Sequence, residues 1–515
     1  MKLMNKLLLV GIFLLVSTKV VFSAEVWLND AKRLFQDNAA IVYEINLRTF
    51  AAQDINKNGI IDFEEKEESG TFLNAIAKLD ELRQKGVNTI HVMPITPVGK
   101  VKALGTAGSL YAATSFNKLN PQLASKNSAL SIEDQAMKFV NEAHKRGLRV
   151  IVDLPSCGSY DLYMQRPDLF LKDSKGQPIT PLDWTDVRVL DAGSDFSINN
   201  AVYELYEDFV KMVINLGFDG IRADVATIKP AKFWDKLIKF SHKRDPQFVW
   251  LAEATEAWNE PVAEGVPFTS YDKLLKAGFD TYYGPFVDFK NWKTSKEFYK
   301  AVEGITDLYT KYDEPKSVIG SFSTHDEISP ILVNGSTYSE MIIWLSATLP
   351  VNAYFVDGFD TGDNYIYMWA NKKARKTYTD DDYYFVHRGK VDIFNFSRPP
   401  LGTNSSIFNN FIVANGFRKR FQSFVSRGKF IPLKTNSEKV VAYAVSYNDK
   451  SLIVIGNLNF RDFENIEVKI SKLKPSNMVI PIKINSIPIV EKGKIVEKIS
   501  PGEIQVLLLD DMAIK

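Results

Sequence analysis

Short apolar runs alternate with amphipathic helical stretches along most of the chain after Ala40. The runs are rich in β-branched and aromatic residues, which favour strands. The stretches between them carry apolar residues at spacings of three and four, which favours helices, as in "TFLNAIAKLDELRQKG" and "EDQAMKFVNEAHKRG". Each of these two ends on the glycine that often follows a helix. The alternation predicts βα units and a parallel sheet.

Eight segments have the strand pattern. They are "AIVYEINLRTF", "GVNTIHVMPI", "GLRVIVDLP", "GFDGIRADVA", "FVWLAEA", "GFDTYYG", "SVIGSFSTHD" and "LPVNAYFVDG". Eight βα units over roughly 350 residues match the size and rhythm of a barrel of eight strands and eight helices with insertions. We therefore predict an α/β fold, a (β/α)8 TIM barrel.

Two regions depart from this alternation. Residues 156–197 follow the third predicted strand and have little periodicity, and loops of this length are usually functional. After about Phe430 the pattern changes to period-two segments such as "VVAYAVSY" and "EIQVLLLD", which predicts an antiparallel β domain. We predict a barrel domain over residues 24–425, with the long loop inserted after its third strand, and a C-terminal β-sandwich domain over residues 426–515.

The first residues, "MKLMNKLLLVGIFLLVSTKVVFS", have the pattern of a secretory signal peptide, which we assign to residues 1–23. Lys2 and Lys6 precede an apolar core that runs from Leu7 to Val16. An uncleaved membrane anchor is the alternative, but this core has only about half of the ~20 residues that a membrane span needs. The sequence therefore predicts a secreted or periplasmic protein with no membrane contact after cleavage.

Composition and charge narrow the class of partner. The chain has 515 residues, of which 45% are hydrophobic and 24% charged, and this is ordinary globular composition. Its 63 basic and 62 acidic residues give a net charge of +1, so no strong field favours nucleic acid or an anionic membrane. Cys157 is the only cysteine, which excludes an intrachain disulfide. A neutral partner fits this balance, and the oligomeric state stays open.

The segment "DINKNGIIDFEE" carries oxygen ligands at the spacing of a calcium loop. Side-chain oxygens recur at alternate positions, Gly59 permits the sharp turn, and one main-chain carbonyl completes the set. The predicted Ca2+ ligands are Asp54, Asn56, Asn58, Ile60, Asp62 and Glu65. An EF-hand is not indicated, because a predicted strand and not a helix precedes the loop. The alternative is a polar turn that satisfies itself through Asx hydrogen bonds.

Acidic residues recur at the C-terminal ends of the predicted strands. They are Asp153, Asp224, Glu253 and Asp326. In a (β/α)8 barrel these strand ends converge on one face, where active sites are built. Any one of these carboxylates could instead cap the helix that follows it. Four of them at equivalent positions favour a shared site.

Two of these carboxylates have surroundings that suit different chemical roles. Arg222 lies two residues before Asp224, so both side chains point to one face of the strand. A guanidinium beside a carboxylate keeps it ionised, as a nucleophile requires. Glu253 follows the apolar segment "FVWLA", which should raise its pKa and suit it to proton donation. An ionised carboxylate about 5–5.5 Å from a protonated one is the arrangement for retaining glycoside cleavage.

These segments resemble the α-amylase family, glycoside hydrolase family 13. Its four short characteristic regions are matched in order by "VIVDLPSCG", "GFDGIRADVA", "LAEA" and "FSTHD". The resemblance extends from about Val42 to the C-terminal β domain. It implies that Asp224 is the nucleophile, with Arg222 as its partner. It also implies that Glu253 is the acid/base and Asp326 the carboxylate that stabilises the transition state.

The resemblance implies further substrate-binding residues and the place of the calcium loop. His325 matches the histidine that contacts sugar hydroxyls, Tyr111 in "GSLYAATSF" resembles the family's stacking tyrosine, and Asp153 lies in the first region. Trp184 in the long loop could line further subsites, because aromatic faces stack on pyranose rings. Both aromatic residues could equally belong to the core. Many members carry a calcium loop directly after the first barrel strand, where "DINKNGIIDFEE" lies.

The chain departs from the family at the end of its first region. Asn and His are usual there, but this chain has Cys157 and Gly158. The missing histidine normally contacts the sugar, and maltosyltransferase-like members also lack it. The segment "KPAKFW" resembles those transferases as well as some amylases.

We therefore expect a retaining glycoside hydrolase with Ca2+ as its cofactor. Its substrates would be the α-glucosidic bonds of starch-type or glycogen-type α-glucans or of maltooligosaccharides. One alternative is an α-glucanotransferase or maltosyltransferase on the same fold. The other is a non-catalytic glycan-binding protein, against which the presence of all three catalytic carboxylates argues.

Overall fold

A computed structural model defines the fold for most of the chain. It describes residues 27–53, 55, 67–104, 108–182, 184–363, 404–470, 479–485, 488–491, 493–510 and 514. The signal peptide predicted at residues 1–23 lies outside this part of the chain. So do the predicted calcium ligands Asp54, Asn56, Asn58, Ile60, Asp62 and Glu65. No helix within the described ranges is long and apolar enough to cross a membrane.

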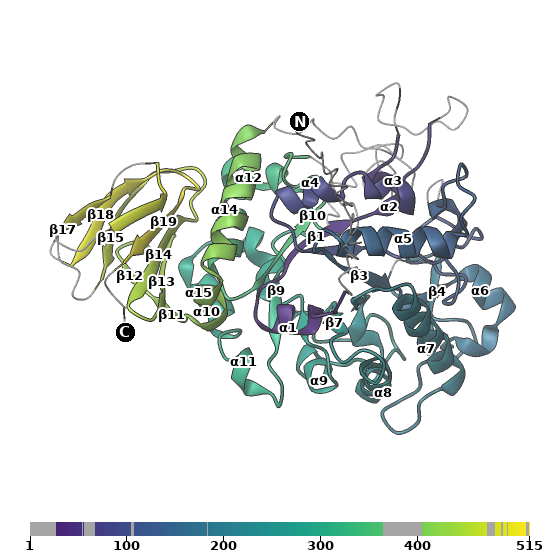
Figure 1. Cartoon of the computed structure of the whole chain (residues 1–515). Coiled ribbons are helices and arrows are strands. Elements are labelled where there is room, and N and C mark those ends of the chain that lie inside the picture. The colour runs from purple at the N-terminus through teal and green to yellow at the C-terminus, as the bar shows by residue number, and fades with distance from the viewer. Residues whose placement is uncertain are drawn as a thin grey trace, which may run out of the picture.

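Eight parallel strands close into a barrel at the centre of the larger part of the molecule (Figure 1). Around the barrel the order is β1-β10-β9-β8-β7-β6-β3-β2. The strands are β1 (Ile41–Ile45), β2 (Thr89–Val92), β3 (Arg149–Leu154), β6 (Gly220–Ala223), β7 (Val249–Ala252), β8 (Thr281–Tyr282), β9 (Ser317–Gly320) and β10 (Asn352–Val356). Each lies within one of the eight predicted segments, so the predicted TIM barrel is confirmed.

Helices cover the outside of the barrel and explain why its strands are continuous apolar runs. In α5 (Ile132–His144) the buried Ala136, Phe139, Val140 and Ala143 form one apolar face, and Ser131 caps the first turn. The other helices on or beside the barrel are α1 (Ala31–Gln36), α2 (Leu47–Phe50), α3 (Phe72–Ile76), α4 (Leu79–Gln84), α7 (Asn200–Asn215), α8 (Ala231–His242), α9 (Tyr271–Lys276), α10 (Ser295–Glu303), α11 (Leu308–Lys311), α12 (Pro330–Thr348), α14 (Ser405–Arg420) and α15 (Gln422–Arg427), with short 3-10 turns η2 (Pro121–Leu123), η4 (Ala226–Ile228) and η5 (Pro285–Asn291).

The barrel interior is apolar near the N-terminal ends of the strands and polar near their C-terminal ends. Val42, Ile151 and Leu251 belong to an interior cluster against which Ala31 and Phe35 of α1 pack. One layer further along the strands, the inward positions carry charged or ionisable side chains. In the strand register, Glu44 of β1 lies beside His91 of β2, and Asp153 of β3 lies beside Arg222 of β6. The barrel thus places its chemistry at the C-terminal end.

The predicted insertion after the third strand is confirmed and has its own small structure. It contains β4 (Cys157–Ser159), α6 (Tyr160–Gln165), η3 (Pro167–Leu169) and β5 (Val187–Val189). β4 and β5 pair antiparallel, and Cys157 packs with Val187 and Val189 in a separate hydrophobic cluster. This pairing fixes the loop that begins directly after β3, at the rim of the barrel.

The C-terminal region consists of two antiparallel sheets, at the left of Figure 1. One has the order β11-β13-β14-β19-β16 and the other β12-β15-β18-β17. Their strands are β11 (Lys429–Pro432), β12 (Lys434–Thr435), β13 (Val440–Tyr447), β14 (Lys450–Asn457), β15 (Glu464–Lys469), β16 (Val479–Lys483), β17 (Ile489–Glu491), β18 (Lys494–Ile499) and β19 (Ile504–Leu509). Both sheets contribute to one core, for example Ile453 from the first and Ile495 from the second. The predicted antiparallel β domain is confirmed.

Candidate active site

Arg222 is the centre of the polar end of the barrel. Its Nη1 lies 2.8 Å from Oδ1 of Asp153 and 3.0 Å from Oδ1 of Asp224, and its Nη2 lies 2.8 Å from Oε1 of Glu253. Nε donates a hydrogen bond to the hydroxyl of Tyr283 at 3.1 Å. One fully buried guanidinium therefore joins three carboxylates from three neighbouring strand ends. Asp224 and Glu253 face adjacent nitrogens of this group, as a closely spaced carboxylate pair would.

Asp224 also receives two hydrogen bonds from one residue of the loop after β3. The backbone N–H and the hydroxyl of Ser156 donate to Oδ2 of Asp224 at 3.1 and 2.8 Å. The pKa of Asp224 is raised above its usual value by burial and by the nearby Asp153, while Arg222 and Ser156 act in the opposite direction. The sequence led us to expect that Arg222 alone would hold Asp224 ionised. The structure adds Ser156 as a second source of stabilisation for the anion.

The position of Ser156 is itself fixed from behind. Its carbonyl oxygen accepts hydrogen bonds from the hydroxyl of Tyr206 at 2.9 Å and from Nζ of Lys229 at 2.8 Å. Lys229 is buried, which lowers its pKa to about 8. Cys157 is buried too, and burial raises the pKa of its thiol to about 12, so it is no nucleophile at neutral pH. These contacts hold the segment that replaces the family's usual Asn-His pair.

Glu253 has the surroundings of a proton donor. Burial raises its pKa to about 8, and Asp224 and Asp326 act in the same direction, while Arg222 opposes them. Its Oε2 accepts a hydrogen bond from the backbone N–H of Val225 at 2.6 Å. Val225 has a φ of 34°, which is unusual for a β-branched residue and turns this N–H towards Glu253. At neutral pH Glu253 is therefore mostly protonated and Asp224 is the better nucleophile.

Tyr111 and His325 complete the site on the other side of Asp153. The hydroxyl of Tyr111 donates to Oδ2 of Asp153 at 2.7 Å and lies 3.1 Å from Nε2 of His325. The two rings stack with centroids 5.7 Å apart. Nε2 of His325 also lies 3.2 Å from Oδ1 of Asp326, whose side chain is partly exposed. The structure thus brings Tyr111, His325 and Asp326 together with Asp153.

Trp184 has a different setting from the other predicted site residues. It is half-buried and packs against the hydrophobic cluster that contains Cys157, Val187 and Ile228. This cluster supports the loop inserted after β3. A part for Trp184 in substrate binding stays a prediction.

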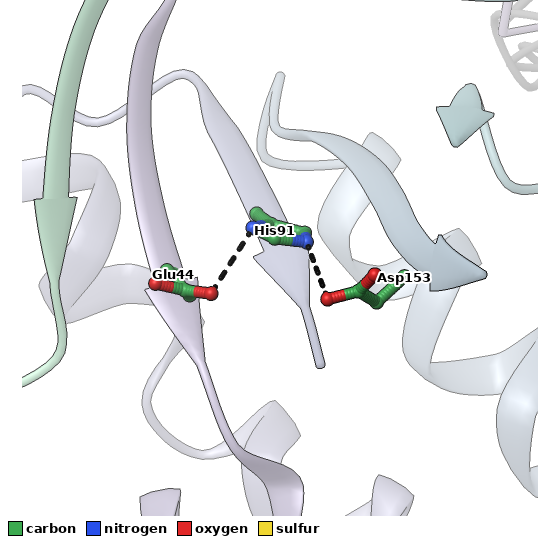
Figure 2. A group of neighbouring side chains, drawn as sticks. All are labelled: Glu44, His91 and Asp153. Carbon is green, nitrogen blue, oxygen red and sulfur yellow. Dashed lines mark ion pairs between the residues drawn. The ribbon is translucent and has the colours of Figure 1, made fainter. Parts of the chain in front are cut away.

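Glu44, His91 and Asp153 are three buried ionisable residues inside the barrel (Figure 2). One ligand atom from each lies within 4.8 Å of the others, so their proximity alone would allow a shared metal ion. However, Nδ1 of His91 faces Glu44 at 3.4 Å while Nε2 faces Asp153 at 3.6 Å. Figure 2 shows the imidazole lying between the two carboxylates. Its two nitrogens point in opposite directions, and Nδ1 lies closer to the hydroxyl of Tyr354, at 2.7 Å, than to Glu44, so the imidazole separates the two carboxylates.

Sequence reasoning missed Glu44, His91 and Tyr283, and it offered Ser156 only as a possible substrate contact, not as a donor to Asp224. Glu44 and His91 did carry a signal, since each is a polar residue within an apolar run predicted to be a buried strand. Such residues are rarely buried without a partner. Ser156 carried no such signal, because its role depends on how the loop after β3 folds back over Asp224.

The fold and site define a (β/α)8 barrel protein with paired carboxylates suited to glycoside chemistry. Comparison with solved structures agrees with the fold. A maltogenic α-amylase, AmyB from Thermotoga neapolitana, superposes with a TM-score of 0.66 and 19% identity over 92% of this chain and 99% of its own. An α-amylase from Geobacillus thermoleovorans, solved with acarbose, gives a TM-score of 0.67 with 17% identity, over 93% and 99% of the two chains.

Sequence comparison finds maltosyltransferases and isoamylases as relatives. An alpha-1,4-glucan:maltose-1-phosphate maltosyltransferase from Cereibacter sphaeroides is 22% identical over 421 residues, which is 76% of this chain and 63% of the relative. Isoamylase SU1 from Zea mays is 24% identical over 222 residues, 41% of this chain and 27% of the relative. The chain thus spans less than two thirds of either relative. No family model matches the chain. The resemblance to the α-amylase family, and to its maltosyltransferase-like members, is confirmed.

Proposed function

We propose that this protein is a retaining glycoside hydrolase that acts on α-glucosidic bonds of α-glucans or maltooligosaccharides. The observation that supports this most is the pair of carboxylates on Arg222. Asp224 carries Arg222 and Ser156 as stabilising donors, whereas Glu253 has a pKa of about 8. Two neighbouring carboxyl groups in opposite protonation states supply the nucleophile and the acid of a double displacement.

In the first step Asp224 attacks the anomeric carbon while Glu253 gives its proton to the glycosidic oxygen. The C–O bond to the leaving group breaks, and a glycosyl ester forms on Asp224. In the second step the Glu253 carboxylate takes a proton from water, and the resulting hydroxide oxygen displaces Asp224 from the sugar. Asp326 would face the positively charged transition state, which a carboxylate stabilises.

Transfer is the second candidate, since hydrolysis and transfer differ only in whether water or a sugar hydroxyl reaches the glycosyl-enzyme. The relative that aligns with 76% of this chain is named a maltosyltransferase. This chain has Gly158 where α-amylases usually have a histidine, and the maltosyltransferase-like members of that family also lack this histidine. Both observations favour keeping transfer as the alternative.

Chromatography of products after incubation with maltooligosaccharides tests the proposal. Hydrolysis predicts only shorter oligosaccharides, and transfer predicts longer ones as well. Asp224→Asn should remove at least about 99% of either activity, because the loss of a covalent step raises the barrier by several kcal/mol. Absence of any change in the oligosaccharides with the wild-type protein would favour the glycan-binding alternative.

We also propose that the loop from Asp54 to Glu65 binds Ca2+ and that residues 1–23 direct secretion. The ligand chemistry of the loop supports the first proposal. Gln53 and Glu68, which flank this segment, form an antiparallel bridge. The charged start and apolar core of residues 1–23 support the second.

A further inference from the structure

Five side chains close a ring of polar contacts beneath the proposed catalytic carboxylates. They are Glu44, His91, Asp153, Tyr111 and His325. Glu44 Oε1 lies 2.6 Å from Nδ1 of His325, which is the shortest of these contacts. His91 lies between Glu44 and Asp153 (Figure 2), and Tyr111 links Asp153 back to His325. The ring lies on β1, β2, β3 and the loops that follow β2 and β9.

The hydrogen bonds around the ring indicate the protonation state of His325. Asp153 is held ionised by Arg222, and although burial opposes this, its pKa is lowered to about 2. Tyr111 has one hydroxyl proton and gives it to Asp153 at 2.7 Å. Its oxygen must then accept the contact with Nε2 of His325, so Nε2 carries a proton. A proton on Nδ1 is needed as well if Glu44 is ionised.

Glu44 has the properties of an ionised carboxylate that depends on a cation. It is buried, and among the described residues no donor hydrogen-bonds to its Oε2. Burial opposes ionisation, yet the pKa of Glu44 is lowered, chiefly by the contact with His325 and to a smaller extent by His91 and Arg222. His91 needs no charge here, because the Tyr354 hydroxyl, 2.7 Å from Nδ1, can donate to that nitrogen. A buried anion with one unbonded oxygen is costly unless its partner is charged.

We propose that Glu44 is a positioning residue that holds His325 as a doubly protonated imidazolium in a fixed orientation beside Asp326. The charged and titratable groups around His325 are consistent with this. Glu44 and Asp326 contact it directly, Tyr111 stacks on it, and His91, Asp153 and Arg222 lie behind. A fixed cation there offsets the negative charge of Asp326 near Asp224 and Glu253. The effect on catalysis rests on the proposed function, whereas the protonation state does not.

Nuclear magnetic resonance of ¹⁵N-histidine-labelled protein tests the protonation state directly. The chain has five histidines, and His325→Gln identifies the signals of His325 by their loss. We expect both ring nitrogens of His325 to carry protons at pH 7.5, about one unit above the ordinary histidine pKa of ~6.5. In Glu44→Gln, which keeps the side-chain shape without the charge, one of these protons should be lost at pH 7.5. A neutral His325 in the wild type would overturn the proposal.

Tyr354→Phe is the matched control. It removes the hydrogen bond between Tyr354 and His91, in the same layer of the barrel, without removing a charge. His325 should stay doubly protonated in this variant. Loss of its second proton in Tyr354→Phe, or its retention in Glu44→Gln, would show that the charge of Glu44 is not the cause. If Glu44→Gln does not fold, the wild-type titration still decides the proposal.

The pH profile of kcat/KM on maltooligosaccharides gives the functional readout. Glu44→Gln should lower kcat about 10-fold to 100-fold and move the alkaline limb above pH 8, because a neutral His325 no longer offsets the negative charge of Asp326, which raises the pKa of Glu253. A purely structural defect would lower activity without moving the limb, and that result would overturn the proposal. If the wild type shows no glucan activity, the proposed function fails while the spectra still test His325.

Discussion

Ser156 is the residue that most changes how the nucleophile is understood. Two of its donors meet at one oxygen of Asp224, and hydrogen bonds to a charged group are worth about 1.5–3 kcal/mol. Ser156→Ala removes the hydroxyl and keeps the backbone donor. We expect kcat/KM to fall about 10-fold to 100-fold and the acid limb to move to higher pH, because the Asp224 anion loses stabilisation.

Ser159→Ala is the matched control for that variant. The hydroxyl of Ser159 accepts from the backbone N–H of Leu162 at 3.1 Å and caps α6. Its loss should cost about 1 kcal/mol of stability with activity retained. Equal losses of activity in the two variants would contradict the role given to Ser156.

Glu253 determines the expected pH dependence. Its carboxyl must be protonated for the first step, and burial raises its pKa to about 8. Activity should therefore fall as pH rises through about 8, in the kcat/KM profile that reports on the free enzyme. The pKa of Glu253 is also higher in the folded state than its ordinary value of 4.5. The contribution of Glu253 to the stability of the folded state is therefore lost as the pH rises from about 4.5 to about 8. A profile that stays flat to pH 9.5 would contradict this assignment.

At the scale of elements, the packing around β4 explains why this chain has Gly158 where the α-amylase family usually has a histidine. A Cβ at Gly158 would lie 2.8 Å from Cζ of Phe170 and 3.1 Å from Cδ2 of Leu162. The position therefore points into packed apolar side chains of the inserted loop. Gly158→His should lower both the melting temperature and activity, since overpacking typically costs 1–3 kcal/mol.

Gly158→Ala separates crowding from the loss or gain of a sugar contact. It places only the Cβ against Phe170, so the loss of stability should be smaller than in Gly158→His. A tenfold or greater gain in kcat/KM for Gly158→His over wild type, about 1.4 kcal/mol of transition-state binding, would show instead that the site merely lacks its histidine.

The elements of the barrel could be predicted because buried parallel strands and amphipathic helices carry strong local patterns. Even β8, which is only Thr281–Tyr282, lies in a predicted segment. The pairing of β4 with β5 could not be predicted, since each has three residues and they are joined by contacts 28 to 32 residues apart. The same limit applies to the site. Carboxylates such as Asp224 could be predicted because they stand at the ends of predicted strands. The hydrogen bonds from Ser156 could not, because they depend on how the loop after β3 folds.

At the scale of the whole molecule, the barrel and the C-terminal sheets are joined by specific contacts. The hydroxyl of Tyr299 on α10 bonds to the backbone N–H and C=O of Ala442 on β13, and Thr348 of α12 bonds to Tyr443 at 2.6 Å. Periodicity predicts both parts, but it contains no information on which surfaces meet. These contacts depend on side chains about 100 to 140 residues apart.

Removal of calcium should act on the whole molecule through stability. If the loop from Asp54 to Glu65 binds Ca2+ only when folded, free calcium at one hundred times Kd adds about 2.7 kcal/mol. A chelator should therefore lower Tm, measured by differential scanning calorimetry. Asp62→Asn with Glu65→Gln is the control, and its Tm should no longer respond to the chelator. An identical wild-type Tm with and without chelator, and no calcium by elemental analysis, would refute the site.

The central claim is that Asp224 forms a covalent bond to the sugar. Incubation of the Glu253→Gln variant with an α-maltosyl fluoride tests it, because fluoride leaves without acid help while the second step lacks its base. Mass spectrometry of the digested protein should then find a maltosyl group on the peptide that contains Asp224. Turnover of the fluoride to a product of inverted configuration, or an adduct on another residue, would contradict the account.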